Sequence, residues 1–107
     1  MLTRNRNAQY VLLLLSAAVA FGQSYDTRLP DAAKNEDWGL VKTLLKQHVD
    51  ANSMQADRTT ALIWTAHYGN TEIAKELLAA GADVKAANRY GSSALSEAAD
   101  LVKKAVA

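Results

Sequence analysis

The sequence predicts an all-α fold in which short antiparallel helix pairs stack side by side and are joined by extended loops. Half of the 107 residues are hydrophobic and only 7% are aromatic. Leucine and alanine supply most of the hydrophobic half, and both favour helices. The chain also matches itself under a shift that carries Leu29 onto Leu62, a period of about 33 residues. A repeat of that length is typical of stacked helical units, each of which buries its apolar face against its neighbours.

Residues 1–22 have the order of a secretory signal peptide. Arg4 and Arg6 precede a mostly apolar run of eleven residues at 10–20, and small residues occupy positions 20 and 22. We therefore expect cleavage before Gln23, with a cut after Ala20 as the second choice. The run is shorter than the roughly 20 residues that cross a bilayer. A buried helix of the domain and an uncleaved anchor are the alternatives.

The internal matches fall on the apolar positions that a structural repeat must share. The shift that places Leu29 on Leu62 also places residues 44–45 on residues 77–78, all of them leucines. A second shift of the same length places the apolar skeleton of the middle unit on a third segment, as Ala61 on Ala94, Leu62 on Leu95 and Ala66 on Ala99. The rest of the chain is thus expected to be a single repeat domain over residues 23–107.

The middle unit, at residues 59–85, shows the helix pair most clearly. Thr60 is a favourable N-cap for a short helix over 61–68, and Gly69 begins a turn. A second helix is expected from residue 71 to about 80, and Gly81 is placed to end it. The spacing of its apolar residues predicts a buried stripe formed by Ile73, Ala74, Leu77 and Leu78.

The first and third units are less regular copies. In the first, Pro30 suits the opening turn of a helix, and polar residues such as Asp31 and Lys34 suggest an exposed N-terminal cap. In the third, Ser93 is expected to cap a helix, and no glycine turn follows. Residues 94–107 are instead interpreted as one helix, with a shared face that contains Leu95, Ala98, Ala99, Val102 and Val106.

The middle unit resembles the ankyrin repeat. Its matching segments, at the family's spacing, are Thr60-Ala61-Leu62-Ile63, Thr65-Ala66, Gly69-Asn70, Leu77-Leu78 and Gly81-Ala82-Asp83-Val84-Lys85. The resemblance extends over about 29–99. It implies an ankyrin-type solenoid of about two and a half repeats, with boundaries near 29–54, 55–87 and a partial unit at 88–107.

Three positions depart from the family pattern. Ile63 replaces the family's histidine, and Arg58 and His48 replace glycines that normally adopt a left-handed conformation. A residue with a side chain pays on the order of 1 kcal/mol for that conformation.

Composition argues against several classes of function. The formal charge is +1, and without Arg4 and Arg6 the chain has ten basic and 11 acidic residues, a net charge of about −1. Nucleic-acid binding usually needs a basic face, so we expect none. The chain has no cysteine and only two histidines, His48 and His67. They lie about half a repeat apart, with no aspartate or glutamate at the spacing of metal ligands. Neither Ser92 nor Ser93 has an orienting base, and no phosphate loop occurs. We expect no catalytic residues, no metal and no cofactor.

The resemblance implies a module that binds another protein through its concave face, at the loop tips and the exposed ends of the inner helices. In this sequence those positions hold Asp57, Thr59, His67, Tyr68, Arg89, Tyr90 and Ser92. Tyrosine and arginine often dominate binding energy. Tyr68 and Tyr90 come from successive units and are expected on one face, although both could instead shield the small core. Trp64 is expected in the core, with a binding anchor as the alternative.

The partner of such a module is not identified by the sequence. The signal peptide predicts a periplasmic or secreted protein that leaves no membrane segment after cleavage, and export of an ankyrin protein is more typical of bacteria. The competing interpretation is a structural role, in which this short array self-associates or caps a larger array of its own kind.

Overall fold

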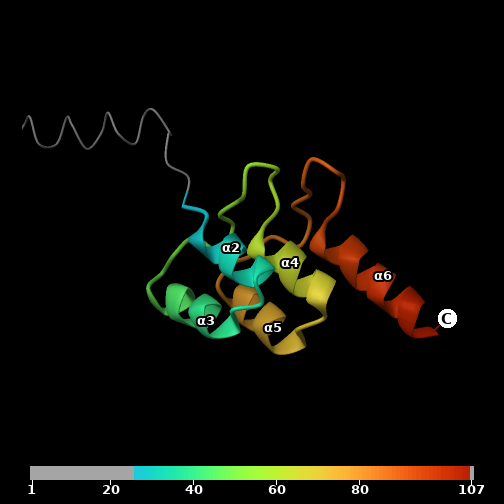
Figure 1. Ribbon diagram of the computed structural model, residues 1–107, viewed down its shortest axis with the longest axis horizontal. Coiled ribbons are helices and arrows are strands. Elements are labelled where there is room, and N and C mark those ends of the chain that lie inside the picture. Colours follow the sequence, from blue (N-terminus) through green and yellow to red (C-terminus); the bar gives the residue numbers. More distant parts are fainter. Residues whose placement is uncertain (1–25, 107) are drawn as a thin grey trace, which may run out of the picture.

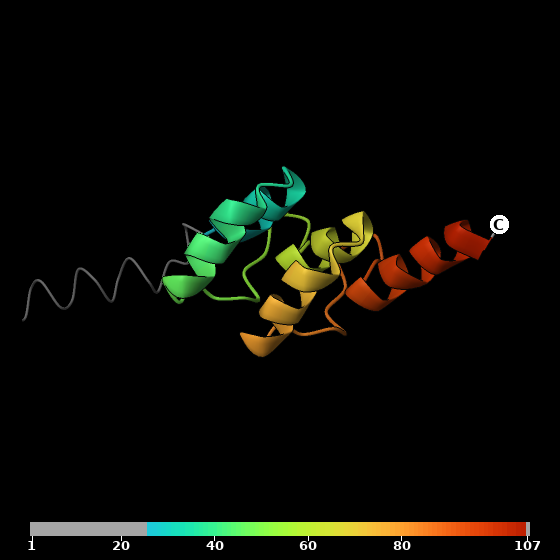
Figure 2. The same ribbon diagram turned by 90° about the horizontal axis from the view of Figure 1, so that it is seen from below.

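The computed structural model describes residues 26–106, which form five helices in two layers (Figure 1). The helices are α2 (Arg28–Lys34), α3 (Trp38–Lys46), α4 (Ala61–Tyr68), α5 (Thr71–Ala79) and α6 (Ala94–Val106). One layer contains α2, α4 and α6, here called the inner helices, and the other contains α3 and α5, the outer helices (Figures 1 and 2). The all-α architecture is as predicted. The expected signal peptide lies outside the described residues.

Side-chain caps begin four of the helices. The side chains of Asp37, Thr60 and Asn70 each accept a hydrogen bond from a backbone N–H in the first turn of α3, α4 and α5, at 3.2, 3.3 and 3.1 Å. At α6 the Ser93 hydroxyl accepts from Ser96 N at 3.2 Å, and the Ser96 hydroxyl accepts from Ser93 N at 2.9 Å. This reciprocal pair is a capping box in which serine takes the place of the usual glutamate. The expected caps at Thr60 and Ser93 are confirmed.

Left-handed backbone recurs at equivalent places in successive repeats. The residues with positive φ that are not glycine are Glu36 (57°), His48 (61°) and Arg58 (68°) in the described part of the chain. Each of them lies one repeat length before a glycine with positive φ: Gly69 (73°), Gly81 (95°) and Gly91 (81°). The turns therefore demand the same backbone in successive units, and the earlier member of each equivalent pair meets that demand with a residue that carries a side chain.

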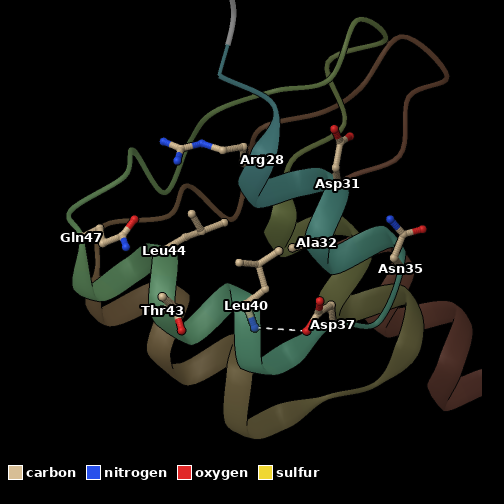
Figure 3. A pocket seen from close by; sticks show the side chains of 9 residues that line it. All are labelled: Arg28, Asp31, Ala32, Asn35, Asp37, Leu40, Thr43, Leu44 and Gln47. Atoms are coloured by element: carbon tan, nitrogen blue, oxygen red, sulfur yellow. Dashed lines mark hydrogen bonds between the residues drawn. The ribbon is translucent and has the colours of Figure 1, made fainter.

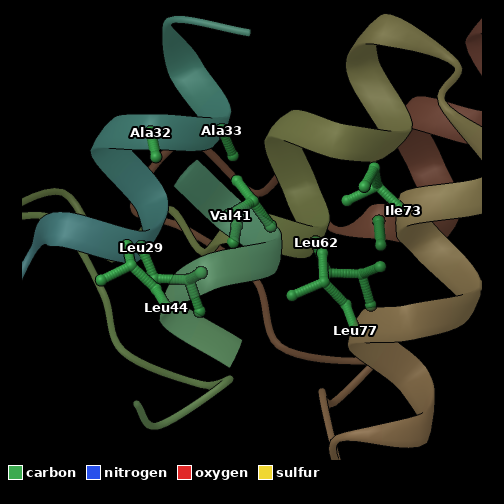
Figure 4. Packing of buried hydrophobic residues seen from close by; sticks show 10 residues of the cluster. Leu29, Ala32, Ala33, Val41, Leu44, Leu62, Ile73 and Leu77 are labelled. Atoms are coloured by element: carbon green, nitrogen blue, oxygen red, sulfur yellow. The ribbon is translucent and has the colours of Figure 1, made fainter. Parts of the chain in front are cut away.

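The core is a repeated contact between one inner and one outer helix. Leu29 of α2 meets Leu44 of α3, and Leu62 of α4 meets Leu77 of α5 (Figure 4). The second pair is the first pair shifted by one repeat. Val41, Ile73 and small alanines of the inner helices fill the space around these leucines. Burial of this set provides the main favourable contribution to folding. The chain has no cysteine, so disulfides add nothing to its stability.

Two leucines of the predicted apolar faces are exposed, and the stack explains both. Leu45 packs against the core, whereas its equivalent Leu78 is 44% exposed because no further outer helix lies beyond α5 in the described chain. Likewise Leu62 is 3% exposed and its equivalent Leu95 is 72% exposed. Figure 2 shows why: α6 lies against α4, and no outer helix of residues 26–106 pairs with α6. Leu78 was thus wrongly included in the buried stripe.

The loops between repeats, at 47–60 and 80–93, are hydrogen-bonded to one another. Asn52 in the first loop donates to Gly81 O at 3.0 Å and accepts from Asp83 N at 2.8 Å in the second. Nearer the tips, Arg89 N donates to Asp57 O at 2.8 Å. These contacts hold the two loops side by side above the inner helices (Figure 1). Among the described helices, none is both long and apolar enough to cross a membrane.

Candidate protein-binding face

The inner helices and the two loops together form a surface, here called the inner face, that contains two hollows. The α2–α4 hollow has a volume of about 490 Å³ and is lined by Thr27, Asp31, Lys34, Gln55, Ala56, Asp57 and Trp64. The α4–α6 hollow has a volume of about 230 Å³ and is lined by Asp57, Thr59, Ile63, Trp64, His67, Asn88, Tyr90 and Glu97. Asp57 and Trp64 line both, so they separate one hollow from the other.

Trp64 is held at this position by a chain of hydrogen bonds that crosses from one repeat to the next. Its indole Nε1 donates to Gln55 Oε1 at 2.8 Å, and Gln55 Nε2 donates to Asp31 Oδ1 at 2.8 Å. The side chain is half-buried and packs against the core cluster. Trp64 therefore belongs both to the edge of the core and to the inner face. The sequence analysis had treated a core position and a binding position as alternatives.

The end of α4 carries a cluster of aromatic rings. Tyr68 stacks on Trp64 with ring centroids 6.1 Å apart and meets the edge of Trp38 at 6.0 Å. Its hydroxyl donates to Lys34 O at 2.7 Å. Although Tyr68 is 37% exposed, its ring and hydroxyl connect the first repeat to the second. The interpretation that this tyrosine shields the core agrees with these contacts.

His67 makes a side-chain contact of hydrogen-bond length across the boundary between the second and third repeats. Its Nδ1 lies 3.0 Å from Glu97 Oε2 on α6. The outer helices show the same spacing, since Lys42 Nζ of α3 lies 3.1 Å from Glu72 Oε1 of α5. In both pairs the partners are 30 residues apart, which is one repeat less about one helical turn. Glu97 was missed in the sequence, and this spacing is the signal that could have identified it.

Asp57 is the carboxylate common to both hollows. Its Oδ1 accepts a hydrogen bond from Thr59 N at 3.0 Å, and the hydrogen bonds from Thr59 lower the pKa of the carboxyl. Lys34 lowers this pKa further through its charge. Asp57 therefore keeps its negative charge on the inner face well below neutral pH.

The structure brings together part of the predicted binding set. Asp57, Thr59, His67 and Tyr90 line the α4–α6 hollow. Tyr90 is 79% exposed, whereas Thr59 is only 2% exposed and offers little surface to a partner. Arg89 and Ser92 lie in the loop beside Tyr90, where Ser92 N donates to Asn88 Oδ1 at 3.0 Å.

Tyr68 does not join Tyr90. Tyr68 is the last residue of α4, whereas Tyr90 lies by the loops that precede the inner helices, near Thr59. The two tyrosines are thus at opposite ends of α4, with Trp64 between them. Repeat stacking places residues from successive units side by side only when they occupy equivalent positions, and Tyr68 and Tyr90 do not.

A further hollow lies at the N-terminal end of the stack and shares Asp31 with the α2–α4 hollow. It is about 440 Å³ and is formed between α2 and α3, with Leu40 and Leu44 on one side and Arg28 and Asp31 across from them (Figure 3). The cap of α3, from Leu40 N to Asp37 Oδ1, lies at its edge (Figure 3). No group of three or more possible metal ligands occurs among residues 26–106.

The comparisons with known proteins agree with the repeated helix pairs. A family model described as "Ankyrin repeats (3 copies)" matches residues 29–106. The crystal structure of the human ASB11 ankyrin repeat domain is similar, with a TM-score of 0.60 and 31% sequence identity over 65% of this chain. The chain covers 32% of the length of that domain. No match was found among the curated proteins. Ankyrin repeats are protein–protein interaction modules, and this chain belongs to the ankyrin repeat family.

Proposed function

We propose that this protein is a non-catalytic module that binds a protein partner through its inner face. The observation that carries the proposal is the fixed position of Trp64 between two hollows, with the exposed Tyr90 at the rim of one of them. Large aromatic side chains in preformed depressions are the usual energetic centres of protein interfaces. The hydrogen bonds through Gln55 fix the indole before binding, which lowers the entropic cost of association.

The proposal includes export. The order of basic, apolar and small residues at 1–22 supports a cleaved signal peptide, and with it a role in the periplasm or outside a bacterial cell. An exported binding module without cysteine must be stable without disulfides, and the core contacts of the helix pairs meet that need.

The test is capture of partners from the cell envelope with the purified protein as bait, followed by quantitative mass spectrometry. Tyr90→Ala should weaken capture of a specific partner by at least about tenfold, which is typical of a central aromatic contact. The matched control is Lys75→Ala, because Lys75 is exposed on the outer helix α5. A partner captured equally by the parent, Tyr90→Ala and Trp64→Phe does not bind the inner face, and that result would refute the proposal.

A second candidate function, self-association, is favoured by the apolar surface of α6. Leu95 and Val102 are 72% and 62% exposed, and a hollow of about 340 Å³ with an apolar lining separates α6 from the ends of α4 and α5. Exposed apolar surface of this kind often marks an interface. Copies of the chain could stack through this surface as further repeats do, which would make the protein a segment of a larger array.

A further inference from the structure

The α4–α6 hollow combines aromatic rings with carboxylates. Trp64, His67 and Tyr90 supply the rings, and Asp57 and Glu97 supply the negative charge. Of the lysines and arginines that the structure describes, none lines this hollow. Carboxylates attract cations, and so do the faces of aromatic rings. The hollow is therefore complementary to a positively charged group that the protein itself does not supply.

The neighbouring α2–α4 hollow shows how such a group is accommodated. Lys34 Nζ lies 5.9 Å from the centroid of the Trp64 ring, and Lys34 lines the α2–α4 hollow together with Asp31 and Asp57. The protein thus places a cation of its own over this indole, and the charge of that cation also lowers the pKa of Asp57. In the α4–α6 hollow the same indole and the same carboxylate are present, and Glu97 adds a second carboxylate.

The indole of Trp64, the carboxylate of Glu97 and the loop backbone at Tyr90 are held by hydrogen bonds before any ligand arrives. Gln55 holds the indole of Trp64, and Asn88 Oδ1 accepts hydrogen bonds from Tyr90 N and Ser92 N, each at 3.0 Å. Glu97 is held by His67 through Oε2, and its side chain is 19% exposed. Its Oε1 accepts no hydrogen bond within the described part of the chain, and the residues that line the hollow there include no lysine or arginine.

The size of the hollow limits the occupant. Its volume of about 230 Å³ lies below the range of roughly 300–1,000 Å³ that holds whole small molecules, and it fits one side chain better. Of the basic side chains, arginine suits these walls best. Its planar guanidinium can stack on an aromatic ring and donate hydrogen bonds to two carboxylates in the same plane, whereas the ammonium of lysine is a compact charge that holds its water more tightly.

We infer that the α4–α6 hollow binds an arginine side chain of the partner, with its guanidinium against Trp64 and Tyr90 and hydrogen-bonded to Asp57 and Glu97. This inference rests on the proposed function and specifies the chemistry of the partner.

The test measures binding of three capped tripeptides, acetyl-Gly-Xaa-Gly-amide, in which Xaa is arginine, citrulline or lysine. Citrulline has nearly the shape of arginine but no charge. Binding is followed by the ¹H–¹⁵N NMR signals of the two indole groups, which Trp38→Phe assigns. The arginine peptide should shift the Trp64 indole signal and leave the Trp38 signal in place, since Trp38 does not line the hollow. The citrulline peptide should cause no shift.

Matched variants localise the effect. Glu97→Gln should weaken binding of the arginine peptide by about threefold or more, as expected for the loss of one charge beside a cation. Glu72→Gln, which removes the equivalent acid of the outer-helix ion pair, should leave binding unchanged. Equal shifts with citrulline, or no effect of Glu97→Gln in a variant that keeps its circular dichroism, would overturn the inference. Equal binding of the lysine peptide would overturn the assignment of arginine.

Failure of this inference is distinguishable from failure of the proposed function. If Tyr90→Ala abolishes partner capture while the arginine peptide causes no shift, the inner face binds a partner through other chemistry and only the inference is refuted. If the peptide binds as expected but capture is the same for the parent and Tyr90→Ala, the hollow accepts arginine and the proposed function is refuted.

Discussion

The Tyr68 hydroxyl donates a hydrogen bond of 2.7 Å to the backbone carbonyl of Lys34, a residue 34 positions earlier in the chain. Tyr68 ends α4 and Lys34 ends α2, so one side chain joins the last turns of two adjacent inner helices. This bond links the first two repeats at the helix ends that lie away from the loops. The hydrogen bonds of Asn52 link the same two repeats at their loops. The boundary between the first two repeats is thus held at both ends.

Removing only this hydroxyl should measurably destabilise the protein. Tyr68→Phe keeps the ring contacts with Trp38 and Trp64 and loses the hydrogen bond, at a cost of about 0.5–1.5 kcal/mol. A domain of this size should then melt several degrees lower, as measured by circular dichroism. Tyr90→Phe is the control, because the Tyr90 side chain is exposed. Equal melting temperatures for Tyr68→Phe and the parent would show that the bond does not join the repeats in solution.

Two adjacent leucines of α5 should differ sharply in their contribution to stability. Leu77 is fully buried against Leu62, whereas Leu78 is 44% exposed. Leu77→Ala should cost about 2–5 kcal/mol, a large part of the stability of so short an array. Leu78→Ala should cost much less, because little of its surface is removed from water. Chemical denaturation of both variants measures the difference, and similar losses would contradict the assigned orientation of α5.

Exchanging residues at equivalent left-handed positions should change stability in opposite directions. Arg58 and Gly91 lie one repeat apart, with φ of 68° and 81°. Arg58→Gly relieves a strain on the order of 1 kcal/mol and should raise the melting temperature by several degrees. Gly91→Arg introduces that strain and should lower it. The space around Gly91 is open, so a change there reports on backbone conformation and not on a steric clash. Shifts in the same direction would refute this account.

The first residue of the mature protein tests the proposed export. If the signal is cleaved as proposed, the intact mass of protein recovered from the periplasm should correspond to a chain that begins at Gln23, or at Phe21 for the second cleavage site. A mass that retains residues 1–22 would show that the segment remains attached and that the protein is tethered.

Charge on the outward face of α6 tests the second candidate function. If copies associate through that face, Leu95→Lys with Val102→Lys should convert an assembly into a monomer in analytical ultracentrifugation, because a charge buried in an apolar contact is costly. Both residues are exposed, so the monomer itself should retain its helicity. A parent protein that is monomeric at high micromolar concentration would exclude this candidate.

The sequence predicted the fold well because each structural signal was repeated. The leucines that form the core recur from one unit to the next, and Gly69 and Gly81 occupy the turns that follow the helices of the second unit. The exposure of Leu78 and Leu95 was not evident, because burial in a stack depends on the neighbouring helix and not on the residue's own helix. Glu36 gave no sign of a left-handed turn, since only its equivalence to Gly69 reveals it.

The candidate site was harder to predict than the fold. Loop residues such as Asp57 and Tyr90 could be placed on the inner face from the repeat pattern, but the side chains that shape the hollows interact across repeats. The contacts of Trp64 with Gln55 and of His67 with Glu97 depend on rotamers and on the offset between adjacent helices. The repeat period alone does not reveal such an offset, which appears as a spacing of 30 residues in the Lys42–Glu72 and His67–Glu97 contacts.

The arrangement of α6 has a consequence for dynamics. This helix packs on α4 alone among the described helices, so it should detach in local unfolding events more readily than the others. Yet it supplies Glu97 to the α4–α6 hollow. A ligand that needs this carboxylate binds only while α6 is docked, and must therefore slow amide hydrogen exchange in α6 by mass action. Binding of such a ligand to the inner face would thus be detected as slower amide hydrogen exchange in α6, the helix with the fewest packing partners in the described chain.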